Sequence, residues 1–314
     1  MATTQEKTEQ QTLEQISFGP STAHRSLWAD VWRQFRRHKG AVVGVALLTI
    51  IILASFIGPM VWPHDPYNLD ISMANLSPSW EHPAGTDTVG RDVFARVLIG
   101  GRISLSVGIA AMVIGTIIGT GIGILAGYFR PLDGPLMRFT DLFLALPILP
   151  LLLVIIMLFR DTLRDAFGPE MGIFILVVFI IGVTSWMQTA RIVRGDVLSI
   201  KKKEFVLAAR SIGTKERRML MRHIFPNTLS PVMVSAALGV AVAIITESAL
   251  SFLGLGFPSD FPTWGRLLFD AKDFLNLAPM RVVWPGVMIS LTVLSVNFIG
   301  DGLRDALDPR LRSR

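Results

Sequence analysis

The sequence predicts an all-α integral membrane protein with six transmembrane helices. Hydrophobic residues make up 51% of the 314-residue chain, charged residues only 17%, and the mean hydropathy is +0.52. Uncharged stretches that could cross a hydrocarbon core of about 30 Å, at about 1.5 Å per helical residue, recur along the chain. Because the sequence lacks the alternating pattern of a β-barrel, each stretch must satisfy its backbone as a helix.

Six apolar stretches are expected to span the membrane. They are Ala41 to Trp62, Ile103 to Phe129, Leu142 to Phe159, Met171 to Ala190, Ile224 to Thr246 and Val282 to Gly300. The first is longer than the apolar core of a signal peptide, so we expect it to remain as an anchor. The predicted parts are an N-terminal tail (1–40), a first transmembrane helix (41–62), an outer loop (63–102), a five-helix core (103–300) with a loop at 191–226, and a C-terminal tail (301–314).

The basic residues predict that both termini are cytoplasmic. Most of the 30 Lys and Arg residues lie in 1–40, 130–138, 191–222 and 304–314, which this topology places on one side. The net charge of +6 then follows from topology. Nucleic-acid binding is not expected, because no basic surface is interleaved with aromatic residues. The absence of cysteine excludes disulfides and thiolate metal sites.

Ahead of the first span, the sequence predicts an amphipathic helix. Trp28, Val31, Trp32 and Phe35 recur at helical spacing, with basic residues on other faces. This is typical of a helix lying in the inner membrane interface and contacting lipid. A basic flank that only fixes topology explains the charges equally well. The polar residues 1 to about 20 are expected to be disordered.

The second predicted span carries four glycines on one helical face, Gly115, Gly119, Gly123 and Gly127. Small residues allow helices to approach closely in a bilayer, where packing drives association. A packing seam within this subunit is the favoured interpretation. The alternative is a seam against another subunit, or a gate.

A basic, helix-competent run, EFVLAARSIGTKERRMLMRHIFPN, separates the fourth and fifth apolar stretches. We expect a short helix from Glu204 to Ile212, with Gly213 as its left-handed stop. Thr214 is expected to cap a second helix, with Glu216 in its first turn.

Within this run, Ala208-Ala209, Gly213 and Pro226 resemble the EAA loop of ABC-importer permeases, the docking element for ATPase subunits; Leu207 stands where that motif usually has Glu. The resemblance implies a docking set comprising Glu204, Ala208, Ala209, Arg210, Ser211, Gly213, Thr214 and Pro226. The alternative is a basic segment that fixes topology and contacts lipid headgroups.

Three further strings resemble the C-type permease subunit of dipeptide, oligopeptide and nickel importers. HPAGTDTVGRD (82–92) is similar to its HPLGTDxxGRD signature, SALSFLGLGF (248–257) to its outer loop, and GDGLRDALDPRLR (300–312) to its C-terminal signature. Around the first string, Val89, Val93 and Val97 predict an amphipathic helix on the outer surface. Candidate contacts with a binding protein are Asp87, Arg91, Asp92, Phe257 and Trp264.

The resemblance implies a type I ABC-importer permease in a bacterial or archaeal inner membrane. Its implied partners are a homologous second permease, two ABC ATPase subunits, and a periplasmic or lipid-anchored solute-binding protein. ATP and Mg would be used by the ATPases, and we expect this chain to be non-catalytic and to hold no cofactor or metal. Its sequence has no GxxxxGK[ST] loop, HExxH motif or Ser-His-Asp set. Peptides, nickel chelates, glutathione and oligosaccharides are the cargo classes left open.

Two other function classes make different predictions from the sequence. A secondary transporter or channel working without ATP predicts buried ionisable residues in mid-span and halves related by an inverted repeat. An intramembrane enzyme needs catalytic residues inside the spans. If the fifth span begins around Leu229, Glu247 lies about 27 Å along it, close to the outer boundary, which favours a boundary residue over a proton relay. Ser248 to Phe257 is expected to fold back at the outer face.

Overall fold

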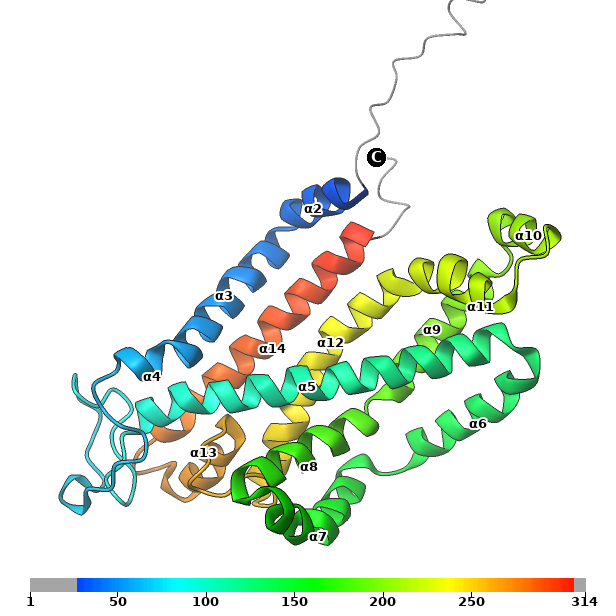
Figure 1. The fold of residues 1–314 in the computed structure, drawn as a ribbon. Helices are drawn as coiled ribbons and strands as arrows, with labels where there is room; N and C mark the ends of the chain where they lie inside the picture. The colour runs from blue at the N-terminus through cyan, green and yellow to red at the C-terminus, as the bar shows by residue number, and fades with distance from the viewer. Residues whose placement is uncertain (1–26, 308–314) are drawn as a thin grey trace, which may run out of the picture.

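The computed structural model describes residues 27–307 as a bundle of helices (Figure 1). The predicted polar segment before residue 27 and the tail after residue 307 lie outside this part. Within it, β geometry is confined to an isolated antiparallel bridge between Thr86 and Asp92. The longer helices are α2 (Leu27–Arg37), α3 (Lys39–Phe56), α5 (Val93–Tyr128), α6 (Arg130–Ala145), α7 (Ile148–Phe167), α8 (Pro169–Val183), α9 (Trp186–Ile200), α12 (Phe225–Phe252) and α14 (Met280–Leu307). The short ones are α4 (Gly58–Val61), η1 (Ile71–Met73), α10 (Glu204–Ser211), α11 (Glu216–Met219), η2 (Leu220–Ile224), α13 (Trp264–Ala271) and η3 (Lys272–Phe274).

Five helical segments in the described chain are long and apolar enough to cross a membrane, and a bent pair could form a sixth span. The five are Lys39–Phe56, Val93–Tyr128, Pro169–Ile200, Glu216–Phe252 and Met280–Leu307. The pair is α6 with α7, which bend by 85°. The all-helical fold class is confirmed, but three of the six predicted helices are interrupted, the first of them at Ile57 between α3 and α4.

The prediction of one straight helix from Leu142 to Phe159 is wrong. Helix α6 ends at Ala145, and α7 begins at Ile148 after an extended Leu146 and Pro147. Proline has no N–H to donate and keeps the preceding residue out of the helical region, so Pro147 separates the two helices.

The predicted helix from Met171 to Ala190 is also interrupted. Thr184 and Ser185 separate α8 from α9, and their hydroxyls donate to the carbonyls of Ile180 (2.8 Å) and Ile181 (2.5 Å). Such bonds from Ser and Thr side chains compete with the helical backbone pattern, which accounts for a break at adjacent hydroxyl residues.

Helix α5 is longer than predicted and absorbs the expected surface helix. It begins at Val93, where the Asp92 carboxylate accepts a hydrogen bond from Ala95 N (2.5 Å), and it continues to Tyr128. Val93 and Val97 are buried in its first turns. Helix α5 therefore begins within the predicted outer segment (63–102), and the helix expected after Gly90 is its first part, not a separate amphipathic helix.

The glycine face of α5 packs on α8 and α9 of the same chain. A Cβ on Gly119 would lie 2.6 Å from Trp186 O and 2.7 Å from Thr189 Cβ. On Gly123 and Gly127 it would lie 2.7 Å from the Cβ atoms of Val193 and Val197. Gly115 is buried in the same contact. The favoured interpretation, a seam within this subunit, is confirmed.

The predicted N-terminal amphipathic helix forms as α2 and is attached to the bundle. Phe35 is buried beside Ala306 and Leu303 of α14, whereas Trp32 is exposed. The guanidinium of Arg36 lies 6.0 Å from the Trp32 ring. One face of α2 therefore packs on protein, and the exposed tryptophan with its neighbouring arginine suits a headgroup layer.

The bundle has two ends (Figure 1). What we call the α10 end holds α2, the C-terminal end of α14, and α10 with α11; Lys201 Nζ there donates to the carbonyls of Gly127 (3.0 Å) and Tyr128 (2.8 Å). The α13 end holds α4, α13 and the loop before α5, and Trp264 Nε1 there donates to Val97 O (3.0 Å). The described residues of the N-terminal segment, of 130–138, of 201–222 and of the C-terminal segment, all predicted to be cytoplasmic, lie at the α10 end.

We expect Gly119→Leu to destabilise the protein by at least about 3 kcal/mol, because a leucine cannot fit between α5 and α9. Gly121→Leu on the same helix is the matched control, since a Cβ there meets nothing within 4 Å. Thermal unfolding of the purified variants in detergent measures the difference. Equal stability of the two variants would show that the seam does not hold the bundle together.

Candidate functional site

At the α13 end, the string resembling HPLGTDxxGRD folds into a turn that holds itself together. The Thr86 hydroxyl donates to Met73 O and accepts from Leu76 N (2.9 Å). Asp87 Oδ1 accepts from Val89 N (3.0 Å) and Arg91 N (2.9 Å). These bonds give the string a structural role at the start of α5.

An ion-pair network lies beside this turn. Asp87 Oδ2 is 2.7 Å from Arg91 Nε and 2.9 Å from the Nη1 of the buried Arg96. Burial alone would raise the pKa of Asp87, but the hydrogen bonds and charge of Arg91 hold it below its usual value. Together with Asp270 and Arg281, these residues line a charged cavity of about 300 Å³.

Three of the residues predicted to contact a binding protein are buried, so the prediction is wrong for them. Phe257 and Trp264 are fully buried (0% exposed), and Asp92 is 3% exposed. Phe257 packs in the core with Leu250, Trp264 donates to the α5 backbone, and Asp92 caps α5. Asp87 and Arg91 stay candidates, because they line the open cavity.

Glu247 lies near the C-terminal end of α12, which ends at Phe252, and the sequence did not indicate that its side chain would be buried. Its side chain is fully buried between α5 and α12, where it accepts hydrogen bonds from Ser104 Oγ (3.1 Å) and Ser251 Oγ (2.8 Å). Ser104 Oγ also accepts from Trp264 N (3.2 Å). Glu247 thus holds the chain that folds back after α12. Residues 248–252 complete α12, so the turn begins later than the predicted start at Ser248, and α13 then packs on α12.

A groove of about 520 Å³ lies where the two helix breaks meet α5 and α12. Its walls include Met112, Phe143, Ile148 and Val242. Its polar groups are Thr184, Ser185, Gln188, Thr189, Ser235 and Thr246. No charged side chain lines it among the described residues. In transporters, interrupted helices beside a groove commonly present hydrogen-bonding groups to a solute.

The loop that resembles the EAA motif forms a helix–turn–helix at the α10 end. Gly213 adopts φ +76°, as predicted, and its N–H donates to Arg210 O (3.0 Å). Thr214 N donates to Ala209 O (3.2 Å), which completes a Schellman motif. Thr214 therefore closes α10, and the prediction that it caps α11 is wrong, because Lys215 holds that position. Glu216 lies in the first turn of α11, as expected.

The two faces of α10 differ. Val206 and Ala209 are buried in a cluster with Val193, Val197 and Met219 of the same chain. On the other face, the exposed side chains include Glu204, Leu207, Ala208, Arg210, Ser211 and Ile212. Ala209 is small because it packs inward, so the expectation that both alanines touch a partner is corrected for Ala209.

Pro226 lies in the first turn of α12, directly after a π-helical turn. Phe225 N donates to Leu220 O, five residues back, where an α-helix would use a carbonyl four residues back. Proline donates no hydrogen bond, so it suits the first turn of a helix and fixes where α12 begins.

The sequence matches two family descriptions. "Binding-protein-dependent transport system inner membrane component" matches residues 119–313, and "N-terminal TM domain of oligopeptide transport permease C" matches residues 26–78. The chain belongs to this permease family. It is thus a multi-pass inner-membrane permease of the kind that serves bacterial ABC importers.

Three relatives cover nearly the whole chain. The dipeptide transport system permease protein DppC of Alkalihalophilus pseudofirmus is 39% identical over 92% of this chain and 91% of its own length. The oligopeptide transport system permease protein OppC of Bacillus subtilis is 38% identical over 91% of each. The glutathione transport system permease protein GsiD of Pectobacterium atrosepticum is 37% identical over 92% of this chain and 93% of its own length.

A solved structure shares the fold. The MetNI methionine ABC transporter, in inward-facing conformations, has a chain that aligns with a TM-score of 0.55 and 16% identity, covering 68% of this chain and 97% of its own length. The similarity supports the helical permease fold predicted from the sequence.

Neither the partners of Glu247 nor the groove was predicted from the sequence. Proline at position 147 and the Thr184-Ser185 pair were the available signals, since both disfavour a continuous helix. Nothing in the sequence paired Glu247 with Ser104, which is far away along the chain.

We expect Glu247→Ala to lower the free energy of unfolding by about 3 kcal/mol, because it leaves the Ser104 and Ser251 hydroxyls without an acceptor and opens a cavity. Glu247→Gln keeps the shape and can bond both hydroxyls, so its cost should be about 1 kcal/mol. Denaturation of both variants in detergent tests this. A glutamine variant as unstable as the alanine variant would show that the charge matters more than the hydrogen bonds.

Proposed function

We propose that this chain forms one half of the solute pathway of an ATP-driven peptide importer. The observation that carries the proposal is the groove at the helix breaks, which is open on one side and flanked by exposed apolar residues of α9 and α12, Ile192 and Val242. A homologous second permease covering this face would enclose the path. The uncharged walls with scattered hydroxyl and amide groups suit a peptide, and relatives named for dipeptide, oligopeptide and glutathione transport support this cargo class.

Two ATPase subunits are proposed to dock at the α10 end. The exposed face of α10 carries Leu207 and, just beyond it, Ile212, which is 84% exposed. An apolar helix face beside basic residues is typical of a helix that fits a groove on a partner. This chain would bind no nucleotide itself, because its sequence lacks a phosphate-binding loop. ATP and Mg would be used by those subunits, and the permease would be non-catalytic.

A periplasmic or lipid-anchored binding protein is proposed to deliver the solute at the α13 end. Asp87 and Arg91 line the cavity there, and the exposed carboxylate of Asp260 lies 3.8 Å from Arg91 Nη1. Charges at a rim steer a partner and fix its orientation.

We expect Ile212→Asp to release the ATPase subunits while leaving the permease folded, because a charge would be desolvated in the docked interface. The predicted loss is about tenfold or more in docking affinity, equivalent to about 1.4 kcal/mol. Leu277→Asp is the matched control, since Leu277 is similarly exposed (83%) but follows α13 at the opposite end. Co-purification of the ATPases and ATP-driven uptake in proteoliposomes are the readouts. Unchanged ATPase binding and uptake in the Ile212 variant would show that this face of α10 is not the docking surface, and would favour a basic segment that fixes topology.

Both termini and the α10 end are proposed to face the cytoplasm, as the distribution of basic residues indicates. The native chain has no cysteine, so single-cysteine variants give a clean map. In intact cells, an impermeant maleimide should label Asp260→Cys, whose side chain is 93% exposed, and should label the exposed Lys202→Cys only after permeabilisation. Labelling of Lys202→Cys in intact cells would contradict the proposed topology and place the α10 end outside.

A further inference from the structure

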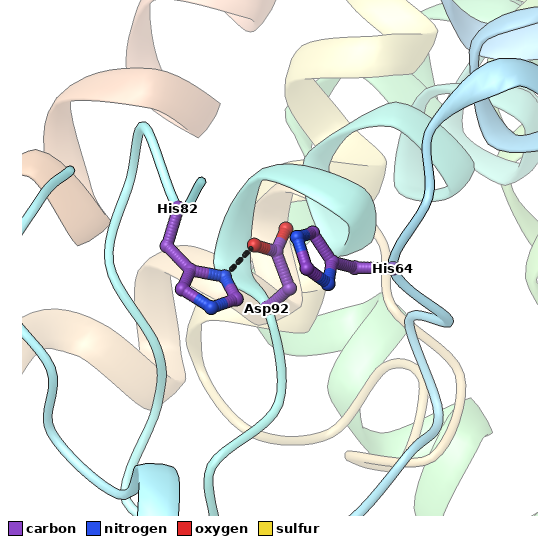
Figure 2. Close-up of side chains that lie close together, drawn as sticks. All are labelled: His64, His82 and Asp92. Atoms are coloured by element: carbon purple, nitrogen blue, oxygen red, sulfur yellow. Dashed lines mark hydrogen bonds and ion pairs between the residues drawn. The ribbon is translucent and has the colours of Figure 1, made fainter. Parts of the chain in front are cut away.

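We propose that His64, His82 and Asp92 bind one divalent transition-metal ion of the zinc class at the α13 end. The three side chains come from separate segments: the chain after α4, the loop before α5, and the cap of α5. Figure 2 shows the two imidazoles on either side of the Asp92 carboxylate. The proposal replaces the expectation that this chain holds no metal.

The donor atoms have the separation that a zinc ion requires. One ligand atom from each residue lies within 4.8 Å of the others, and His82 Nδ1 is 2.6 Å from Asp92 Oδ2. Zinc bonds to nitrogen and oxygen are about 2.0–2.2 Å long, so donors around a tetrahedral ion lie about 3.4 Å apart. The His82–Asp92 separation is shorter than that value and the other two do not exceed 4.8 Å, so adjustment of the side chains would place all three atoms around one ion.

The surroundings already hold two of the ligands in position. Asp92 Oδ1 caps α5 through Ala95 N, which leaves Oδ2 directed at the imidazoles. The backbone of His82 is fixed by bonds with Ser79 and Gly85. His82 and Asp92 are buried (6% and 3% exposed) and His64 is partly buried, so water competes little for the ligands. Bonds that fix the ligands before metal binds favour affinity.

The ligand chemistry selects the class of ion. Two neutral imidazoles and one carboxylate suit Zn²⁺ and its neighbours, whereas Mg²⁺ and Ca²⁺ prefer oxygen ligands. The rings of His64 and His82 have centroids 4.4 Å apart and are tilted by 36°, which permits both to face one point. A bound ion would fasten the loop before α5 to the residues that follow α4.

The test uses the purified full-length chain with an affinity tag that contains no histidine, stripped with a chelator. We expect Zn²⁺ to bind with one ion per chain, measured by elemental analysis after gel filtration, and Co²⁺ to give visible absorption of a tetrahedral site. Zn²⁺ should also raise the melting temperature. Because the chain has no cysteine, thiolate ligands cannot contribute to either signal.

Two ligand variants and a control decide the outcome. His64→Gln removes a ligand, and Asp92→Asn removes the carboxylate while asparagine still caps α5, so the fold is kept. Both should bind Zn²⁺ at least about tenfold more weakly, which equals about 1.4 kcal/mol. His223→Gln, in η2, should bind as the unchanged chain does. The proposal would be overturned if the unchanged chain bound no Zn²⁺, or if both ligand variants bound Zn²⁺ as tightly as the unchanged chain. In that case the His82–Asp92 hydrogen bond would only stabilise the loop before α5.

Discussion

The close approach of α5 to α8 and α9 is the constraint on which the rest of the bundle depends. In a bilayer no hydrophobic gain draws helices together, so contact of backbones across small residues must supply the attraction. The glycine face provides this, and Trp186 O lies only 2.6 Å from where a Cβ on Gly119 would be. Since α5 also contacts α3, α12 and α14, fixing it against α9 positions the remaining spans.

The α13 end depends on a second constraint, which is that buried polar groups need partners. Arg96 is 2% exposed and is paired with Asp87, while Glu247 is paired with hydroxyls of α5 and α12. Trp264 adds a bond from its indole to Val97 O. An unpaired group at any of these places would cost about 1–3 kcal/mol. Within the strings that resemble the family's signatures, Asp87 and Ser251 therefore complete the bonding of the buried Arg96 and Glu247.

Local patterns in the sequence predicted most of the helical segments and one part of the loop that resembles the EAA motif. The apolar stretches indicated the spans, and the left-handed turn at Gly213 followed from residue type. Long-range pairings were not predictable, because a lone sequence does not say which segments meet. Glu247 with Ser104, and His64 with His82 and Asp92, are such cases. The helix breaks were partly predictable, because Pro147 marks the position of one of them.

One set of side chains connects α10 to the glycine face of α5. Val193 and Val197 of α9 lie over Gly123 and Gly127, and they also pack against Val206 of α10. One turn before Val193, Thr189 bonds Ser235 of α12 at the groove (2.9 Å). Close-packed contacts transmit displacement rather than absorb it. In the proposed importer, an ATPase that moves α10 would therefore tilt α9 along the seam and change the width of the groove between α9 and α12.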